Sequence, residues 1–292
     1  MEGLSPVDGW AVFAISAKAA GYAAALVAMG GPLFIATFRE APEEVLRLAR
    51  RAAALAALLG LVVLALRLGI RSARISGIGL AGATDPMMLG LVWDSPLGTA
   101  ALWRGAGEVL ILGLVFRSTL TLAGGVLGAL LVAWSYTQVG HSLGEPRWLL
   151  ASLLGLHLLA AAFWVGALAP LHRAAGRVEG VDLLHRFGII AGGTVAALVL
   201  LGLTFAWLTI GSLGGLFGTA YGWMLIVKLT AVTGLLGLAA RNKLRLVPAL
   251  AAQTPSAPSR LRRAIRLESV VVVLILMATA ALTTITTPPA NL

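Results

Sequence analysis

The sequence predicts an all-α polytopic membrane protein with about eight transmembrane helices, and two observations support this fold class. Hydrophobic residues make up 59% of the 292 residues and charged residues only 12%, against roughly 25% charged residues in an ordinary soluble domain. A hydrocarbon core is crossed by about 20 consecutive apolar residues, and eight runs of this kind follow one another along the chain. There is no cysteine, which excludes disulfides, thiolate metal sites and cysteine nucleophiles.

Short polar connections join most of the eight apolar runs. The expected helices cover roughly residues 11–35, 49–69, 98–116, 119–139, 149–170, 187–209, 221–240 and 267–285. The stretch before Trp10 is acidic and lacks the basic region of a signal peptide, so the first run is predicted to be a retained helix. No G-x-x-x-x-G-K-[ST] motif is present, which excludes a P-loop ATPase.

Two of the connections are longer than the others. In 70–97, Asp85 is a suitable N-cap and Pro86 suits a first helical turn, so a short interfacial helix is expected there. The segment 242–266 is basic and contains three prolines. We expect it to set the topology and to contact anionic lipid headgroups.

Lys and Arg residues are unevenly distributed between the two ends of the expected helices, which predicts the orientation. Most of the 22 fall in the loops after the first, third, fifth and seventh helices. Because cytoplasmic loops carry the excess of these residues, both termini are predicted to be periplasmic. This bias also accounts for the net charge of +10, so the predicted partner is a lipid bilayer, and no nucleic acid.

The chain divides into two expected halves of four helices each, residues 1–139 and 140–292. Gly30 in the first half resembles Gly166 in the second, and a Gly-Thr-Ala sequence precedes both the third and the seventh helix. Four helices give both halves the same orientation, so this would be a parallel repeat. The alternative is that helices rich in Ala, Gly and Leu align by chance.

Two histidines are candidate ligands near the outer surface. His157 lies about eight residues into the fifth expected helix, roughly 12 Å below the surface at 1.5 Å per residue, and His141 lies at the outer end of the fourth. Polar groups inside a bilayer are costly and usually functional, so the two imidazoles are predicted to hold a metal or a haem. The alternative is a structural hydrogen bond for His157 and a solvated loop position for His141.

Four methionines lie at a similar depth or above it: Met87, Met88, Met224 and Met277. Thioethers suit Cu(I), and imidazole suits both oxidation states of copper. They are therefore candidate metal ligands beside the histidines. The alternative is that methionine fills gaps between helices, which is its common structural use.

Three further ionisable residues inside the expected helices are candidates for a role in the site. Arg104 and Glu108 share one helix face at i,i+4 spacing, which favours a buried structural pair, with a proton relay as the alternative. Lys228 lies one turn below Met224 and either extends outward to the surface or lines a path. No catalytic residue and no enzymatic activity are predicted.

Three stretches of the chain resemble the copper resistance protein D (CopD) family. They are Gly140-His141 with His157 to Leu168, then Tyr221 to Leu229 followed by Arg241-Asn242 and Pro248, and then Leu261-Arg262-Arg263 leading to Glu268. The likeness covers about 140–285, and the first half fits the family less closely. His141, His157 and Lys228 match the family pattern.

The resemblance implies an inner-membrane protein of copper handling, active in copper uptake or copper resistance. It also implies a periplasmic copper-binding partner of the CopC type. Two alternatives stay open. One is a haem- or porphyrin-binding oxidoreductase of the HemJ type, with His157 and Lys228 in the matching roles. The other is a membrane partner that binds no cofactor and docks a periplasmic copper chaperone.

Overall fold

The structure, a computed structural model, describes residues 7–140, 144–177 and 180–287. Within these residues the chain is helical, and eight helices are long and apolar enough to cross a membrane, which confirms the predicted fold class. They are α1 (Gly9–Thr37), α2 (Glu43–Ser76), α4 (Pro96–Leu112, continued by the 3₁₀ helix η2, Gly113–Phe116), α5 (Thr119–Thr137), α6 (Arg147–Ala174), α7 (Gly180–Ile210), α9 (Ala220–Arg241, continued by the π-helix η4, Asn242–Leu246, and α10, Val247–Ala251) and α11 (Ala257–Ile285).

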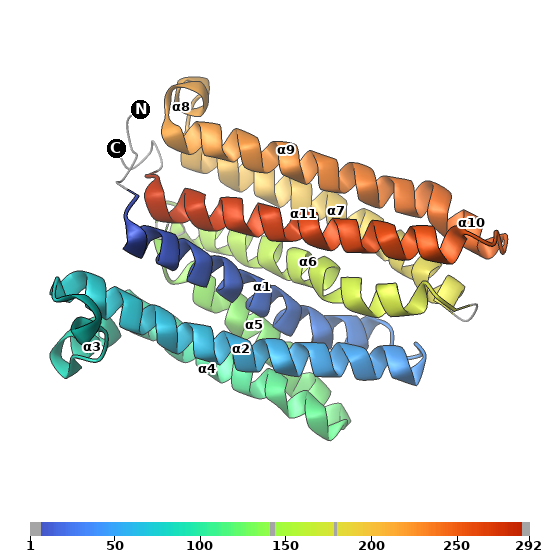
Figure 1. The fold of residues 1–292 in the computed structure, drawn as a ribbon, viewed down its shortest axis with the longest axis horizontal. Helices are drawn as coiled ribbons and strands as arrows, with labels where there is room; N and C mark the ends of the chain where they lie inside the picture. The colour runs from blue at the N-terminus through green and yellow to red at the C-terminus, as the bar shows by residue number, and fades with distance from the viewer. Residues whose placement is uncertain (1–6, 141–143, 178–179, 288–292) are drawn as a thin grey trace.

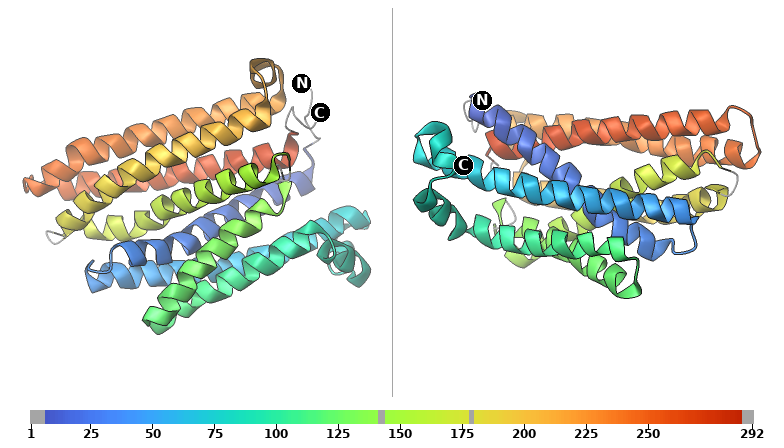
Figure 2. Two further views of the ribbon diagram at one scale, coloured as in Figure 1. Left: turned by 180° about the vertical axis from the view of Figure 1, so that it is seen from behind. Right: turned by 60° about the horizontal axis from the view of Figure 1, so that its bottom comes forward.

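The eight helices lie side by side in one elongated bundle (Figures 1 and 2). One group consists of α1, α2, α4 and α5, and α6 packs against α1 and against α7. The last helix, α11, packs against α9 on one side and α1 on the other. Both described chain ends lie at the same end of the bundle because the number of crossings is even.

Short helices close the bundle at the end that carries the termini. The expected helix after Asp85 is confirmed as α3 (Pro86–Trp93), and the Asp85 side chain accepts a hydrogen bond from the backbone N–H of Met88. The 3₁₀ helix η1 (Gly79–Ala83) packs beside it against α2. Between α7 and α9, α8 (Leu213–Gly218) lies at the opposite edge of the same end (Figure 1).

Two helices extend well beyond their apolar runs. Helix α2 spans Glu43–Ser76, where 49–69 was expected, and α11 begins at Ala257, where 267 was expected. The charged turns outside the hydrocarbon can stay helical because water solvates their side chains. The basic segment 242–266 is consequently mostly helical. Pro258 lies in the first turn of α11, where a missing N–H costs no hydrogen bond, and Pro248 directly follows the π-helix η4 and Val247.

The two groups of helices meet through small and aromatic residues. Gly30 of α1 and Gly166 of α6 pack backbone against backbone. Nearer the end away from the termini, Phe38, Phe163 and Phe187 form an aromatic cluster, with ring centroids 5.7 to 6.2 Å apart. Aromatic pairs at these separations add to the energy of area burial, so this cluster helps to hold the groups together.

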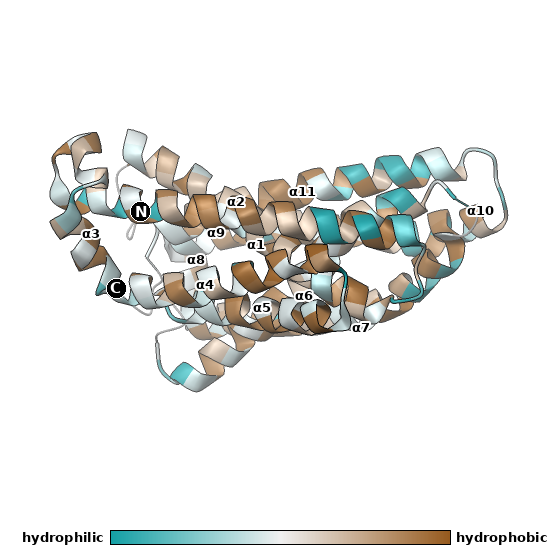
Figure 3. Cartoon of the chain, turned by 90° about the horizontal axis from the view of Figure 1, so that it is seen from below, coloured by the Kyte–Doolittle hydropathy of each residue, from teal (hydrophilic) through white to brown (hydrophobic). Residues whose placement is uncertain are grey.

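Ion pairs join the same two groups at the surface. Glu44 of α2 pairs with Arg173 and Arg177, and Glu40 pairs with Arg186. Hydrophilic residues gather at this end of the bundle, on α2 and α11, whereas the middle of the bundle is mostly hydrophobic (Figure 3). The basic residues thus mark one end of a membrane-spanning bundle.

Candidate functional site

His157 is the histidine that the structure places between membrane-spanning helices. Its Nδ1 atom lies 3.1 Å from the carbonyl oxygen of Leu198 on α7. A carbonyl oxygen only accepts, so this hydrogen bond places a proton on Nδ1, and in the neutral imidazole Nε2 then keeps its lone pair. Metal-binding histidines characteristically donate their second ring N–H to a carbonyl or carboxylate group in the same way.

A glycine on α7 makes room for this imidazole. A Cβ at Gly202 would lie 2.9 Å from Cε1 of His157, closer than real Cβ contacts come. The ring therefore rests on the bare backbone of α7, one turn from the Leu198 carbonyl. On the third helix, α9, Lys228 is close enough for its charge to act on the imidazole. Lys228 has no ion pair within the described parts of the chain.

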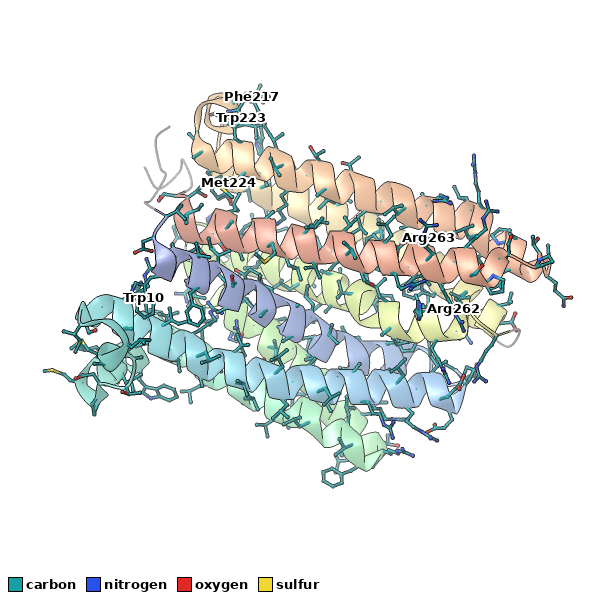
Figure 4. The ribbon with its side chains drawn as sticks, in the orientation of Figure 1. Trp10, Phe217, Trp223, Met224, Arg262 and Arg263 are labelled. Carbon is teal, nitrogen blue, oxygen red and sulfur yellow. The ribbon has the colours of Figure 1, made fainter. Side chains whose placement is uncertain are left out.

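Met224 and Met277 lie on the two helices that complete this half of the bundle. Met224 is at the end that carries the termini, with Trp10, Phe217 and Trp223, whereas Arg262 and Arg263 lie toward the other end (Figure 4). Met224 is half-buried and packs against a small core at the ends of α7, α9 and α11. Met277 is 39% exposed on α11. Met224 is thus in a packing position, and its role as a ligand stays a prediction.

Met87 and Met88 lie elsewhere in the molecule. Both are on α3, which packs against α2, α4 and η1, at the opposite edge of the bundle from α8 (Figure 1). Met87 is 74% exposed. His141 falls outside the described residues. Among the residues that are described, no three His, Cys, Asp or Glu side chains come together as a metal-binding group.

No close ion pair joins Arg104 and Glu108 among the described residues, although the charge of Arg104 acts on the carboxylate, so the expected structural pair stays a prediction. Arg104 donates from Nε to the hydroxyl of Ser135 at 3.3 Å, and its guanidinium lies 3.8 Å above the ring of Tyr136. Glu108 is only 1% exposed and turns toward Gly60 of α2. Its Oε2 atom is buried without a hydrogen-bond partner. Arg104 thus contacts Ser135 and Tyr136 of α5 directly, whereas it acts on Glu108 only through its charge.

Arg104 belongs to a polar cluster that the sequence did not reveal, formed with Lys18, Tyr22, Arg67 and Tyr136. Lys18 donates to the carbonyl oxygen of Thr283 at 2.8 Å, and the rings of Tyr22 and Tyr136 are 5.7 Å apart. The expected helix 49–69 leaves Arg67 near its outer end, but the residue lies inside α2, where its charge acts on Lys18 and Arg104. The three cations come from α1, α2 and α4, so only the tertiary structure brings them together.

These features define a class of protein. A buried imidazole held by a backbone carbonyl and several cations without ion pairs, all inside an apolar helix bundle, are typical of membrane proteins that bind or move a solute. Residues 8–146 match the family model of the copper resistance protein D-like N-terminal domain, and residues 181–282 match that of copper resistance protein D. The chain belongs to the copper resistance protein D family.

Membership in this family makes the chain a multi-pass copper resistance protein of the bacterial inner membrane, and it fits the expectation of a non-enzymatic protein. The first half, which was expected to fit less closely, is covered by its own family domain. His157 lies between the two matched regions, whereas Met224, Lys228 and Met277 lie within the second. No curated protein and no solved structure matches the chain.

Proposed function

We propose that the protein binds copper in the outer third of the membrane, with His157 as the central ligand, and passes it across the membrane in copper uptake or copper resistance. The observation that carries this proposal is the orientation of His157. Its Nδ1–H is held by the Leu198 carbonyl, and Nε2 makes no hydrogen bond within the described residues. Neutral imidazole with one free nitrogen is the form that binds copper.

The remaining candidate ligands fall into two groups. His141, Met224 and Met277 are the proposed further ligands near His157, toward the periplasmic ends of their helices. Met87 and Met88 on α3 are proposed as ligands that receive copper at the surface, and the exposure of Met87 supports this role. A periplasmic copper-binding protein of the CopC type is the proposed donor or acceptor there.

Lys228 has a proposed role in the release of the metal. A cation near His157 repels Cu(I) or Cu(II), which weakens binding and keeps the site from holding copper irreversibly. Transport requires binding that is strong enough to load and weak enough to leave. We also propose that both termini lie on the periplasmic side and that the chain divides into two halves, residues 1–139 and 140–292.

The test is metal content and visible absorbance of the detergent-purified full-length chain after loading with Cu(I) under reducing conditions. We expect His157→Ala to weaken copper binding by roughly tenfold or more. The matched control is His185→Ala, because His185 is an exposed histidine near the start of α7, away from Leu198 and Gly202. Copper retained equally by both variants and the wild type would overturn the proposal.

The same sample separates the alternative functions. A Soret band in the wild type that His157→Ala removes would identify a haem or porphyrin protein of the HemJ type. Equal copper binding by the wild type and a His141→Ala/His157→Ala double variant would favour a protein that only docks a copper carrier.

A further inference from the structure

A cavity of about 190 Å³ lies between the end of α1, the start of α2 and the turn that leads into α5. A cavity for a single water molecule needs only roughly 10–15 Å³, so this one has room for a polyatomic group. Arg39, Arg50 and Arg117 line it, together with the hydroxyl-bearing residues Ser118 and Thr121. It lies at the end of the bundle away from the termini, far from His157 and the proposed copper site.

The arginines of the cavity wall are not neutralised. Their only nearby ion-pair partner among the described residues is Glu43, whose Oε1 lies 3.6 Å from Arg50 and 3.7 Å from Arg117. The same oxygen also lies 3.9 Å from Arg47. Arg39 has no ion pair within the described part of the chain, and Nη1 of Arg50, the atom 3.6 Å from Glu43, is buried without a closer acceptor. The wall therefore carries three guanidinium groups against one carboxylate, which is an excess of positive charge.

The other acidic residues near this end are engaged elsewhere. Glu40 pairs with Arg186, and Glu44 pairs with Arg173 and Arg177 of the second half. They balance the charge of the α6–α7 connection and do not balance that of the cavity. An anion from outside the chain would complete the charge balance of the wall.

Helix α5 begins at the cavity with a capping box, in which Ser118 and Thr121 exchange hydrogen bonds at 3.1 Å. The positive end of the helix dipole favours an anion at this position. Immediately before it, Arg117 has φ of 53°, a left-handed conformation that is unfavourable for a residue other than glycine. Such strained positions concentrate at ligand-binding sites.

The cavity lining also contains four apolar residues, Ile35, Leu46, Leu114 and Leu122. We propose that this cavity binds a phosphate-bearing anion, either the phosphodiester of an anionic lipid headgroup or inorganic phosphate. Guanidinium groups bind phosphate oxygens in bidentate pairs, which favours phosphate over a simple halide. The mixed lining and the position at one end of the membrane-spanning helices favour the lipid as the source.

The experiment uses the full-length chain after removal of bound lipid in detergent. Phosphatidylglycerol, phosphatidylcholine and sodium phosphate are added separately at one ionic strength, and the shift in melting temperature and the bound lipid by native mass spectrometry are measured. We expect phosphatidylglycerol to raise the melting temperature and to remain bound. In Arg39→Gln/Arg117→Gln the affinity should fall by roughly tenfold or more, since two charge-assisted contacts are lost.

The matched control is Arg51→Gln/Arg241→Gln, which removes the same charge from exposed positions at the same end but outside the cavity lining. It should bind as the wild type does. Stabilisation by sodium phosphate as strong as that by phosphatidylglycerol would make the free anion the ligand. No stabilisation by either, or equal losses in the cavity and control variants, would overturn the proposal. Arg39→Lys/Arg117→Lys separates charge from geometry, because lysine keeps the charge without the bidentate contact, so it should bind less tightly than the wild type.

Discussion

Gly30→Ala would insert a methyl group where α1 crosses α6. A Cβ at residue 30 would lie 2.6 Å from Cα of Gly166 and closer still to the carbonyl oxygen of Ala162. Non-bonded carbon atoms settle at about 3.5–4.0 Å, so the two helices must separate by about 1 Å. Overpacking of this kind costs typically about 1–3 kcal/mol. We expect the upper part of that range because the obstacle is backbone, which cannot rotate away as a side chain can.

The assay is thermal unfolding of the detergent-purified protein, followed by tryptophan fluorescence. At roughly 2–4 °C per kcal/mol for a chain of this size, Gly30→Ala should lower the melting temperature by about 5–10 °C. The controls are Gly105→Ala and Gly124→Ala, where a Cβ would meet nothing within 4 Å. Since alanine has the higher helix propensity, these variants should melt at or above the wild-type temperature. A Gly30→Ala protein that melts with its controls would refute the close crossing of α1 and α6.

Two further predictions concern carboxylates. Glu108→Gln keeps the shape of a side chain whose Oε2 has no hydrogen-bond partner and removes a charge that is costly to bury. We expect an unchanged or higher melting temperature, and a marked drop would show that the carboxylate is stabilised as an anion, with Arg104 as the cation that acts on it. Glu44→Gln removes the ion pairs with Arg173 and Arg177. Because these pairs are partly exposed, the free energy of unfolding in urea titrations should fall by about 1 kcal/mol at low salt and by less in 1 M NaCl. A decrease that does not change with salt would contradict a charge interaction.

The membrane spans could be predicted because lipid imposes one rule on all of them. Each needs enough apolar residues to cross the hydrocarbon, and composition alone shows this. Helix ends could not be predicted in the same way. Once α11 leaves the hydrocarbon, nothing in the hydropathy distinguishes a solvated helix from a loop, so the basic turns from Ala257 onward were missed.

The partners of the intramembrane polar residues were harder to predict. The i,i+4 spacing of Arg104 and Glu108 indicates proximity along one helix. The direct contacts of the guanidinium are instead with Ser135 and Tyr136 of α5. His157 could be singled out from its position in an apolar run. Its orientation could not, because it depends on Leu198, a residue 41 positions away, whose contribution is a backbone carbonyl that any residue type would supply.

The contact between Gly30 and Gly166 bears on the predicted parallel repeat, which stays a prediction. These two residues were paired as equivalents from sequence, and residues related by a two-fold axis touch only where they lie on it. A two-fold axis at this point would exchange α1 with α6 and α5 with α11. The packing agrees with this exchange, since α5 and α11 each contact both α1 and α6. At the level of Gly30 and Gly166 the two backbones touch, so the interface between α1 and α6 has no space for an ion there. Copper that crosses between the halves must therefore separate these two helices, whereas copper that crosses beside His157, between α6, α7 and α9, leaves this interface closed.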